Sequence, residues 1–145
     1  MTDPGNFGSG GLGGALGNVA GNAIVRRRAE KYAAEGKAEV ALRVLEGTQE
    51  GLKGGWRRGV ATLWSGRLDF ESAVGGFHPW RRPAAAIPVT AIDASAPRTA
   101  AGKDALTLDQ NALIVGVLTP TARLELAVAP PYRLEWVLQR IWPAR

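Results

Sequence analysis

Four segments near the C-terminus decide the fold: ALTLD (105–109), NALIVGVLTP (111–120), TARLELAVAP (121–130) and PYRLEWVLQRIW (131–142). The first three are short apolar runs separated by turn residues. In the third, Leu124, Leu126 and Val128 alternate with other side chains, so that they point to one face. Alternation with a period of two residues is typical of a half-buried strand. These runs therefore predict strands near the end of the chain.

The fourth segment predicts a helix over residues 131–142. Its apolar residues recur at i, i+3, i+4 and i+7, namely Leu134, Val137, Leu138 and Ile141. That spacing gives a helix one apolar face, and prolines are favoured in a first helical turn. Tyr132 and Trp136 fall on the opposite side of this helix, and we interpret them as a candidate partner surface.

A hairpin is predicted upstream, where GVATLW (59–64) and RLDFES (67–72) flank Ser65-Gly66. A two-residue loop containing Gly is the typical tight turn between antiparallel strands. Such a loop sets the register, with the predicted pairs Trp64–Arg67, Leu63–Leu68 and Ala61–Phe70. The last two pairs share a face and are expected to point into the core.

Taken together, the segments predict a mainly β fold, with residues 96–104 as a loop. The expected strands lie near 59–64, 67–72, 78–82, 88–94, 105–108, 112–118 and 122–128. This is a small bent antiparallel sheet or barrel of about seven strands, capped by the C-terminal helix. The layout suggests a pleckstrin-homology-like (PH-like) sheet, which is a scaffold for binding.

The N-terminal part is expected to be separate from this β domain, which we place at 56–145. Residues 1–25 are Gly-rich and are interpreted as a flexible or conditionally helical segment. If this segment is helical, Gly13, Gly17 and Gly21 form a face for close helix association. Self-association or weak membrane association through this face is then the alternative to a flexible segment. Residues 26–47 are predicted to be a charged amphipathic helix that ends at Gly47, and residues 48–55 a linker.

Composition disfavours catalysis. The chain has no cysteine and one histidine, His78, which excludes disulfides and thiolate chemistry and disfavours transition-metal sites. No serine lies in a G-x-S-x-G pattern. We therefore expect no enzyme, no catalytic residues, no metal and no cofactor. A small hydrolase is the least favoured alternative.

If the net charge of +5 has a function, it favours an anionic partner. The candidate contacts to an anionic surface are Arg26, Arg27, Arg28, Arg57, Arg58, Arg81 and Arg82. An anionic membrane surface is one such partner. A nucleic acid is the alternative, and it is disfavoured because the sequence lacks a basic stripe with interleaved aromatic residues.

The segments GWRRGVATLWSGRLDF, PWRRP, IPVTAID, LTLDQNALIV and TARLELAVAP together resemble a family of small actinobacterial proteins of unknown function. The resemblance covers roughly residues 54–142. It implies an N-terminal membrane helix, a PH-like or GRAM-like cytosolic domain and no established activity. This chain departs from the pattern where its Gly-rich segment replaces a strong membrane span. We therefore expect a cytoplasmic, non-enzymatic interaction or adaptor module that binds a protein partner at or near the inner face of the membrane.

Overall fold

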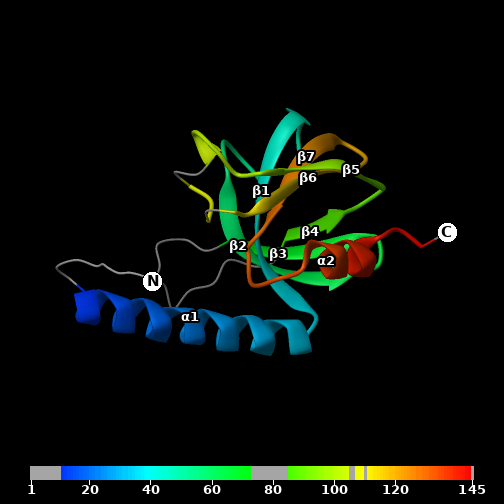
Figure 1. The fold of residues 1–145 in the computed structure, drawn as a ribbon. Coiled ribbons are helices and arrows are strands. Elements are labelled where there is room, and N and C mark those ends of the chain that lie inside the picture. The colour runs from blue at the N-terminus through cyan, green and yellow to red at the C-terminus, as the bar shows by residue number, and fades with distance from the viewer. Residues whose placement is uncertain (1–10, 73–84, 105–106, 110, 145) are drawn as a thin grey trace.

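The computed structural model describes residues 11–72, 85–104, 107–109 and 111–144, with side chains from residue 23 onward. Within these residues the chain forms two helices and seven strands (Figure 1). In chain order they are α1 (Gly11–Ala34), β1 (Lys37–Gly47), β2 (Arg57–Trp64), β3 (Arg67–Ser72), β4 (Ala85–Pro88), β5 (Ala91–Thr99), β6 (Leu113–Leu118), β7 (Ala122–Val128) and α2 (Leu134–Ile141).

The strands form one antiparallel sheet in the order β4-β3-β2-β1-β7-β6-β5. Its two edges, β4 and β5, are separated in the chain by Val89 and Thr90 alone. The sheet therefore bends until its edges approach one another, and at this corner Val89 N and Thr90 N donate to the carbonyl oxygens of Gly66 and Leu118. The sheet stays open and is not a closed barrel. The prediction of a mainly β fold with a bent antiparallel sheet and a C-terminal helix is confirmed.

The core lies inside the bend of the sheet. The predicted hairpin register is confirmed, because β2 and β3 pair Trp64 with Arg67, Leu63 with Leu68 and Ala61 with Phe70. The inward residues of β1, β2, β3 and β7 meet the apolar stripe of α2 there. The largest fully buried side chains of this core are Phe70, Leu42, Leu68, Ile87, Leu124, Leu126, Ile141, Val117 and Val137. Ile114 is equally buried but packs in a smaller cluster with Ala41 and Ala127. α2 thus covers the open side of the bent sheet, as its spacing predicts (Figure 1).

The predicted helix over 26–47 is wrong in its second half. α1 spans Gly11–Ala34, and Lys37–Gly47 forms β1, the central strand of the sheet. The helix ends because Gly36 takes a φ of +74°, a conformation that glycine adopts readily and other residues rarely. Beyond it, Ala38, Val40 and Leu42 are buried at every second position, which is the period of a strand. The β domain therefore begins before the predicted linker.

The elements between β3 and β6 also differ from the prediction. The strand expected near 88–94 is divided into β4 and β5 at the corner, and β5 continues to Thr99 into the predicted loop. Of the strand expected near 105–108, Thr107 and Leu108 lie in turn and bend conformations. Leu108 is buried, because it packs on the outer face of the sheet with Ala41 and Ala127. The expected strand at 78–82 lies outside the described residues.

α1 lies along one end of the domain, and its first half extends beyond the sheet (Figure 1). Gly13, Gly17 and Gly21 all fall in this half. Among the described residues, no helix combines the length and the apolar character that crossing a bilayer requires.

Candidate functional site

A cluster of three side chains lies where α1 meets the domain. Arg28 of α1 contacts both carboxylate oxygens of Glu39 on β1, with Nε to Oε1 and Nη2 to Oε2 each at 3.1 Å. The hydroxyl of Tyr132 donates to Glu39 Oε1 at 3.0 Å. We call Arg28, Glu39 and Tyr132 the clasp. Ala29 is buried beside it in the main core.

The electrostatics of the clasp follow from its burial. Tyr132 is only 7% exposed, and desolvation, followed by the charge of Glu39, raises the pKa of its hydroxyl well above the ordinary value. The hydrogen bond to Glu39 raises the pKa of Arg28. Both groups thus keep their protons at neutral pH, and Glu39 accepts from both.

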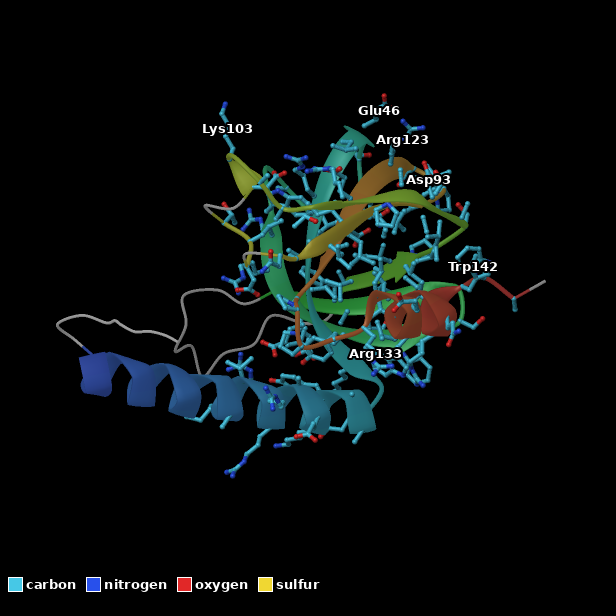
Figure 2. The ribbon with its side chains drawn as sticks, in the orientation of Figure 1. Glu46, Asp93, Lys103, Arg123, Arg133 and Trp142 are labelled. Atoms are coloured by element: carbon cyan, nitrogen blue, oxygen red, sulfur yellow. The ribbon has the colours of Figure 1, made fainter. Side chains whose placement is uncertain are left out.

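A groove of about 840 Å³ lies between α1 and the segment that contains α2. It is lined by Arg26, Ala29, Glu30, Ala33, Pro131, Tyr132, Arg133, Glu135, Trp136 and Gln139. Figure 2 shows Arg133 at the end of the molecule where α2 faces α1. We call this the interhelix groove. Its lining combines apolar side chains with charges of both signs.

The two aromatic residues that we interpret as a partner surface both line the interhelix groove. Trp136 is partly buried, and the guanidinium of Arg140 lies 5.4 Å from the centre of its ring. Tyr132 does not stand on the exposed side of a helix, since α2 begins only at Leu134 and the ring of Tyr132 is buried in the core. Trp136 is therefore the accessible member of the pair.

The arginines that we interpret as anionic-surface contacts do not gather on one basic face. Arg26 lines the interhelix groove, and Arg27 is exposed on α1. Arg28 belongs to the clasp. Arg57 donates from Nε to the carbonyl oxygen of Lys53 at 2.9 Å, and Arg58 lies 3.4 Å from Asp109. Arg81 and Arg82 lie outside the described residues.

Ion pairing within the chain is general in the described residues. The pairs are Arg28–Glu39, Lys37–Glu35, Arg43–Glu125, Arg43–Asp104, Arg58–Asp109, Arg67–Asp69, Arg98–Asp104 and Arg98–Glu125. At the far end of the molecule, Glu46, Asp93 and Arg123 again place both signs together (Figure 2). The net charge of +5 is therefore distributed over the surface, with much of the arginine charge locally compensated.

A polar network that the sequence does not indicate lies on the outer face of the sheet. Arg98 of β5 bonds Asp104 at 2.7 Å and Glu125 of β7 at 2.9 Å, and Arg43 of β1 also pairs with Glu125. Trp56 Nε1 donates to Asp104 at 3.0 Å, and the guanidinium of Arg43 lies 4.8 Å from the centre of the Trp56 ring. The hydrogen bond from Arg98, followed by that from Trp56, holds the pKa of Asp104 below its usual value. This network fastens the segment after β5 to the sheet.

Two adjoining hollows of about 260 and 270 Å³ lie beside this network on the same outer face. Both are lined by Glu39, Arg58, Asp109 and Ala129. We call them together the alanine trough, because Ala41 and Ala127 of paired strands also line the first hollow. Small side chains at these outward positions leave space that larger residues would fill. Arg28 lines the second hollow, so the structure brings Arg28 and Arg58 to one site.

The described residues contain no group of three or more His, Cys, Asp or Glu side chains suited to a metal ion. Asp69 on β3 accepts from Trp64 Nε1 at 2.8 Å and pairs with Arg67 at 3.0 Å. His78 lies outside the described residues. The interhelix groove and the alanine trough are two of the hollows that the described residues offer for binding.

No protein-family model, curated protein or solved structure matches the chain. The resemblance to the actinobacterial family therefore stays a prediction, and function has to be argued from the geometry of the chain itself.

Proposed function

We propose that this protein is a non-enzymatic interaction module that binds a protein partner through the interhelix groove. The observation that carries the proposal is the distribution of charge. Most arginines with described partners contact carboxylates of the same chain, and the groove carries Arg26 and Arg133 together with Glu30 and Glu135. A partner with charges of both signs suits such a lining.

The charge distribution favours a protein over the other partners of a basic chain. Nucleic acids present a uniform row of phosphates, and their affinity comes largely from Lys and Arg that neutralise several of them. An anionic membrane likewise attracts clusters of basic residues. A lining of mixed sign gains little from either. A polypeptide can pair its own acidic and basic side chains with these charges while it places apolar side chains against Ala33 and Trp136.

The shape of the groove favours a helical segment of the partner. Its two walls are α1 and the α2 segment, and an amphipathic helix laid between two helices is a recurrent mode of recognition. Ala33 is partly exposed and small enough to let a third helix approach α1 closely. Trp136 supplies an aromatic contact of the kind that dominates many interfaces. The partner is expected to present apolar residues at i, i+3, i+4 and i+7.

The cellular location that we propose for this interaction is the one expected from the sequence. We propose a PH-like scaffold in the cytoplasm, at or near the inner face of the membrane, with α1 as tether or assembly element. The part of α1 that extends beyond the sheet carries Gly13, Gly17 and Gly21 (Figure 1). Self-association through this face is compatible with a partner helix in the interhelix groove, because the groove involves the other half of α1.

Two matched variants of α1 test the proposal. Ala33→Gln fills the groove with a neutral residue of good helix propensity, whereas Ala34→Gln makes the same change at an exposed neighbour outside the lining. A polypeptide retained by the immobilised full chain is purified and titrated against both variants. We expect Ala33→Gln to weaken binding at least about tenfold, or about 1.4 kcal/mol, and Ala34→Gln to change it less than twofold.

The alternatives are tested in the same experiment with anionic vesicles, neutral vesicles and a DNA duplex. Binding to duplex or anionic vesicles that falls steeply with salt, without a polypeptide that distinguishes the two variants, would contradict the proposal. Equal loss with Ala33→Gln and Ala34→Gln would show that the groove is not the binding site.

A further inference from the structure

We propose that the alanine trough binds a small organic anion, a carboxylate with a short apolar chain. This inference concerns the outer face of the sheet and is independent of the protein partner proposed for the interhelix groove.

The apolar part of the trough follows from the pairing of β1 with β7. Ala41 and Ala127 are register partners on the outer face, and both are buried although neither is in the main core. Leu108 and Ala112, from the segment after β5, pack beside them and form part of the wall. Their side chains leave the remaining hollow of about 260 Å³ unfilled. An aliphatic chain placed there would bury its surface against methyl groups.

The polar lining of the trough consists of Glu39, Asp109, Arg28 and Arg58, and Arg58 is the group among them that can meet an anion. Among the described residues, Arg58 forms hydrogen bonds through Nη2 alone. This nitrogen lies 3.4 and 3.5 Å from the two carboxylate oxygens of Asp109. The Arg58 and Asp109 side chains are 56% and 46% exposed, so the pair is weak and is easily exchanged. A guanidinium has five N–H donors and is suited to holding a carboxylate through two of them. Asp109 can turn to water when a ligand takes its place.

The neighbouring arginine does not compete for this role. Arg28 is engaged with both oxygens of Glu39, and Glu39 also accepts from Tyr132. Arg58 is therefore the cation of the trough that is available to a ligand. The net charge of +5 favours the approach of an anion over that of a cation. The volumes of the two hollows lie slightly below the usual range of ligand pockets, about 300–1,000 Å³, which favours a short chain.

Three probes with six carbon atoms each separate the head groups: hexanoate, hexylammonium and 1-hexanol. The full chain carries ¹³C-labelled alanine methyl groups, and each probe is titrated while their NMR shifts are followed. We expect hexanoate to shift the methyl signals of Ala41, Ala127 and Ala129 saturably, and to bind at least tenfold more tightly than the other two probes. The signals of Ala38 and Ala61, in the main core, are expected to stay constant and to report an intact fold.

Neighbouring arginines provide the matched variants. Arg58→Gln is expected to weaken hexanoate binding at least tenfold, and Arg57→Gln, the same change at the adjacent residue outside the trough, less than twofold. Ala129→Leu fills the part that both hollows share and is expected to abolish the shifts, whereas Ala91→Leu on β5 is expected to leave them unchanged. The absence of any saturable shift in the unmodified protein overturns the proposal, as do equal affinities for the three probes or equal effects of the two arginine variants.

Discussion

Replacing Glu39 by Gln is expected to loosen α1 from the domain. The carboxylate of Glu39 is the common acceptor of the clasp, bonded to Arg28 and to the Tyr132 hydroxyl. A glutamine of the same shape keeps one oxygen acceptor but loses the charge. The substitution therefore tests whether this carboxylate, and not merely the packing of Ala29, holds α1 in place.

The expected magnitude follows from the burial of each bond. The bond from Tyr132 joins a buried hydroxyl to a charged acceptor, a class that contributes about 1.5–3 kcal/mol, and the partial exposure of Glu39 favours the lower end. The Arg28 side chain is 47% exposed, and pairs of this kind contribute about 0–1 kcal/mol. Only the bond from Arg28 joins α1 to the sheet, so Glu39→Gln is expected to weaken α1 docking by about 1 kcal/mol at most, or roughly fivefold in the docking equilibrium. The loss of the bond from Tyr132 lowers the stability of the domain itself.

Hydrogen exchange followed by mass spectrometry provides the assay, with the peptide that spans residues 23–36 as the reporter. We expect Glu39→Gln to speed exchange in this peptide up to about fivefold, and Tyr132→Phe, which leaves the Arg28–Glu39 pair in place, to change it less. Arg67→Gln, which removes an exposed ion pair on β3, serves as the control and is expected to leave the peptide unchanged. Unaltered exchange in Glu39→Gln, or an equal change in the control, would refute the reasoning.

Three further predictions concern the fold and can be checked by urea denaturation. Leu126→Ala on β7 and Leu138→Ala on α2 should each lower the free energy of unfolding by about 2–5 kcal/mol, because both side chains are buried in the main core. Losses below about 0.5 kcal/mol would contradict the assignment of these side chains to the inward faces. Gly47→Ala should cost about 1–3 kcal/mol or more, since Gly47 has a φ of +80° and an added Cβ would lie 2.2 Å from the Thr121 carbonyl oxygen; an unchanged midpoint would contradict this. The pKa of Asp104 is lowered in the folded chain, so its ionised form stabilises the fold above the pKa of about 3.9 in the unfolded chain, and this contribution is lost as the pH falls through the lower pKa of the folded chain. The free energy of unfolding should therefore decline more steeply between pH 5 and pH 2 in the unmodified protein than in Asp104→Asn. Parallel profiles would exclude this role.

Elements with local determinants could be predicted from the sequence. The register of the β2–β3 hairpin depends on a two-residue loop in which Gly66 takes a positive φ of +75°, and such a loop leaves one pairing available. The apolar stripe of α2 is equally local, because its spacing alone distinguishes a helix from a strand. In both cases the signal lies within about a dozen neighbouring residues.

The local sequence of β1 does not decide between a helix and a strand. Val40, Ala41, Val44 and Leu45 fit one face of a helix, while Ala38, Val40 and Leu42 fit one face of a strand. The strand prevails because β2 and β7 lie on either side of it and pair with its backbone along both edges. β7 comes about 80 residues later in the chain, so the decisive hydrogen bonds are absent from any local window.

The candidate sites depend on tertiary structure for the same reason. By itself the sequence determined that the chain would form a mainly β domain closed by a C-terminal helix, with no cysteine chemistry and an excess of arginine. Only the folded chain decided that Glu39 meets Tyr132, 93 positions later, and that Ala41 lies opposite Ala127 beneath Leu108. Periodicity reports which face a residue occupies within its own element, whereas charge neutralisation and the shape of a groove depend on which elements become neighbours.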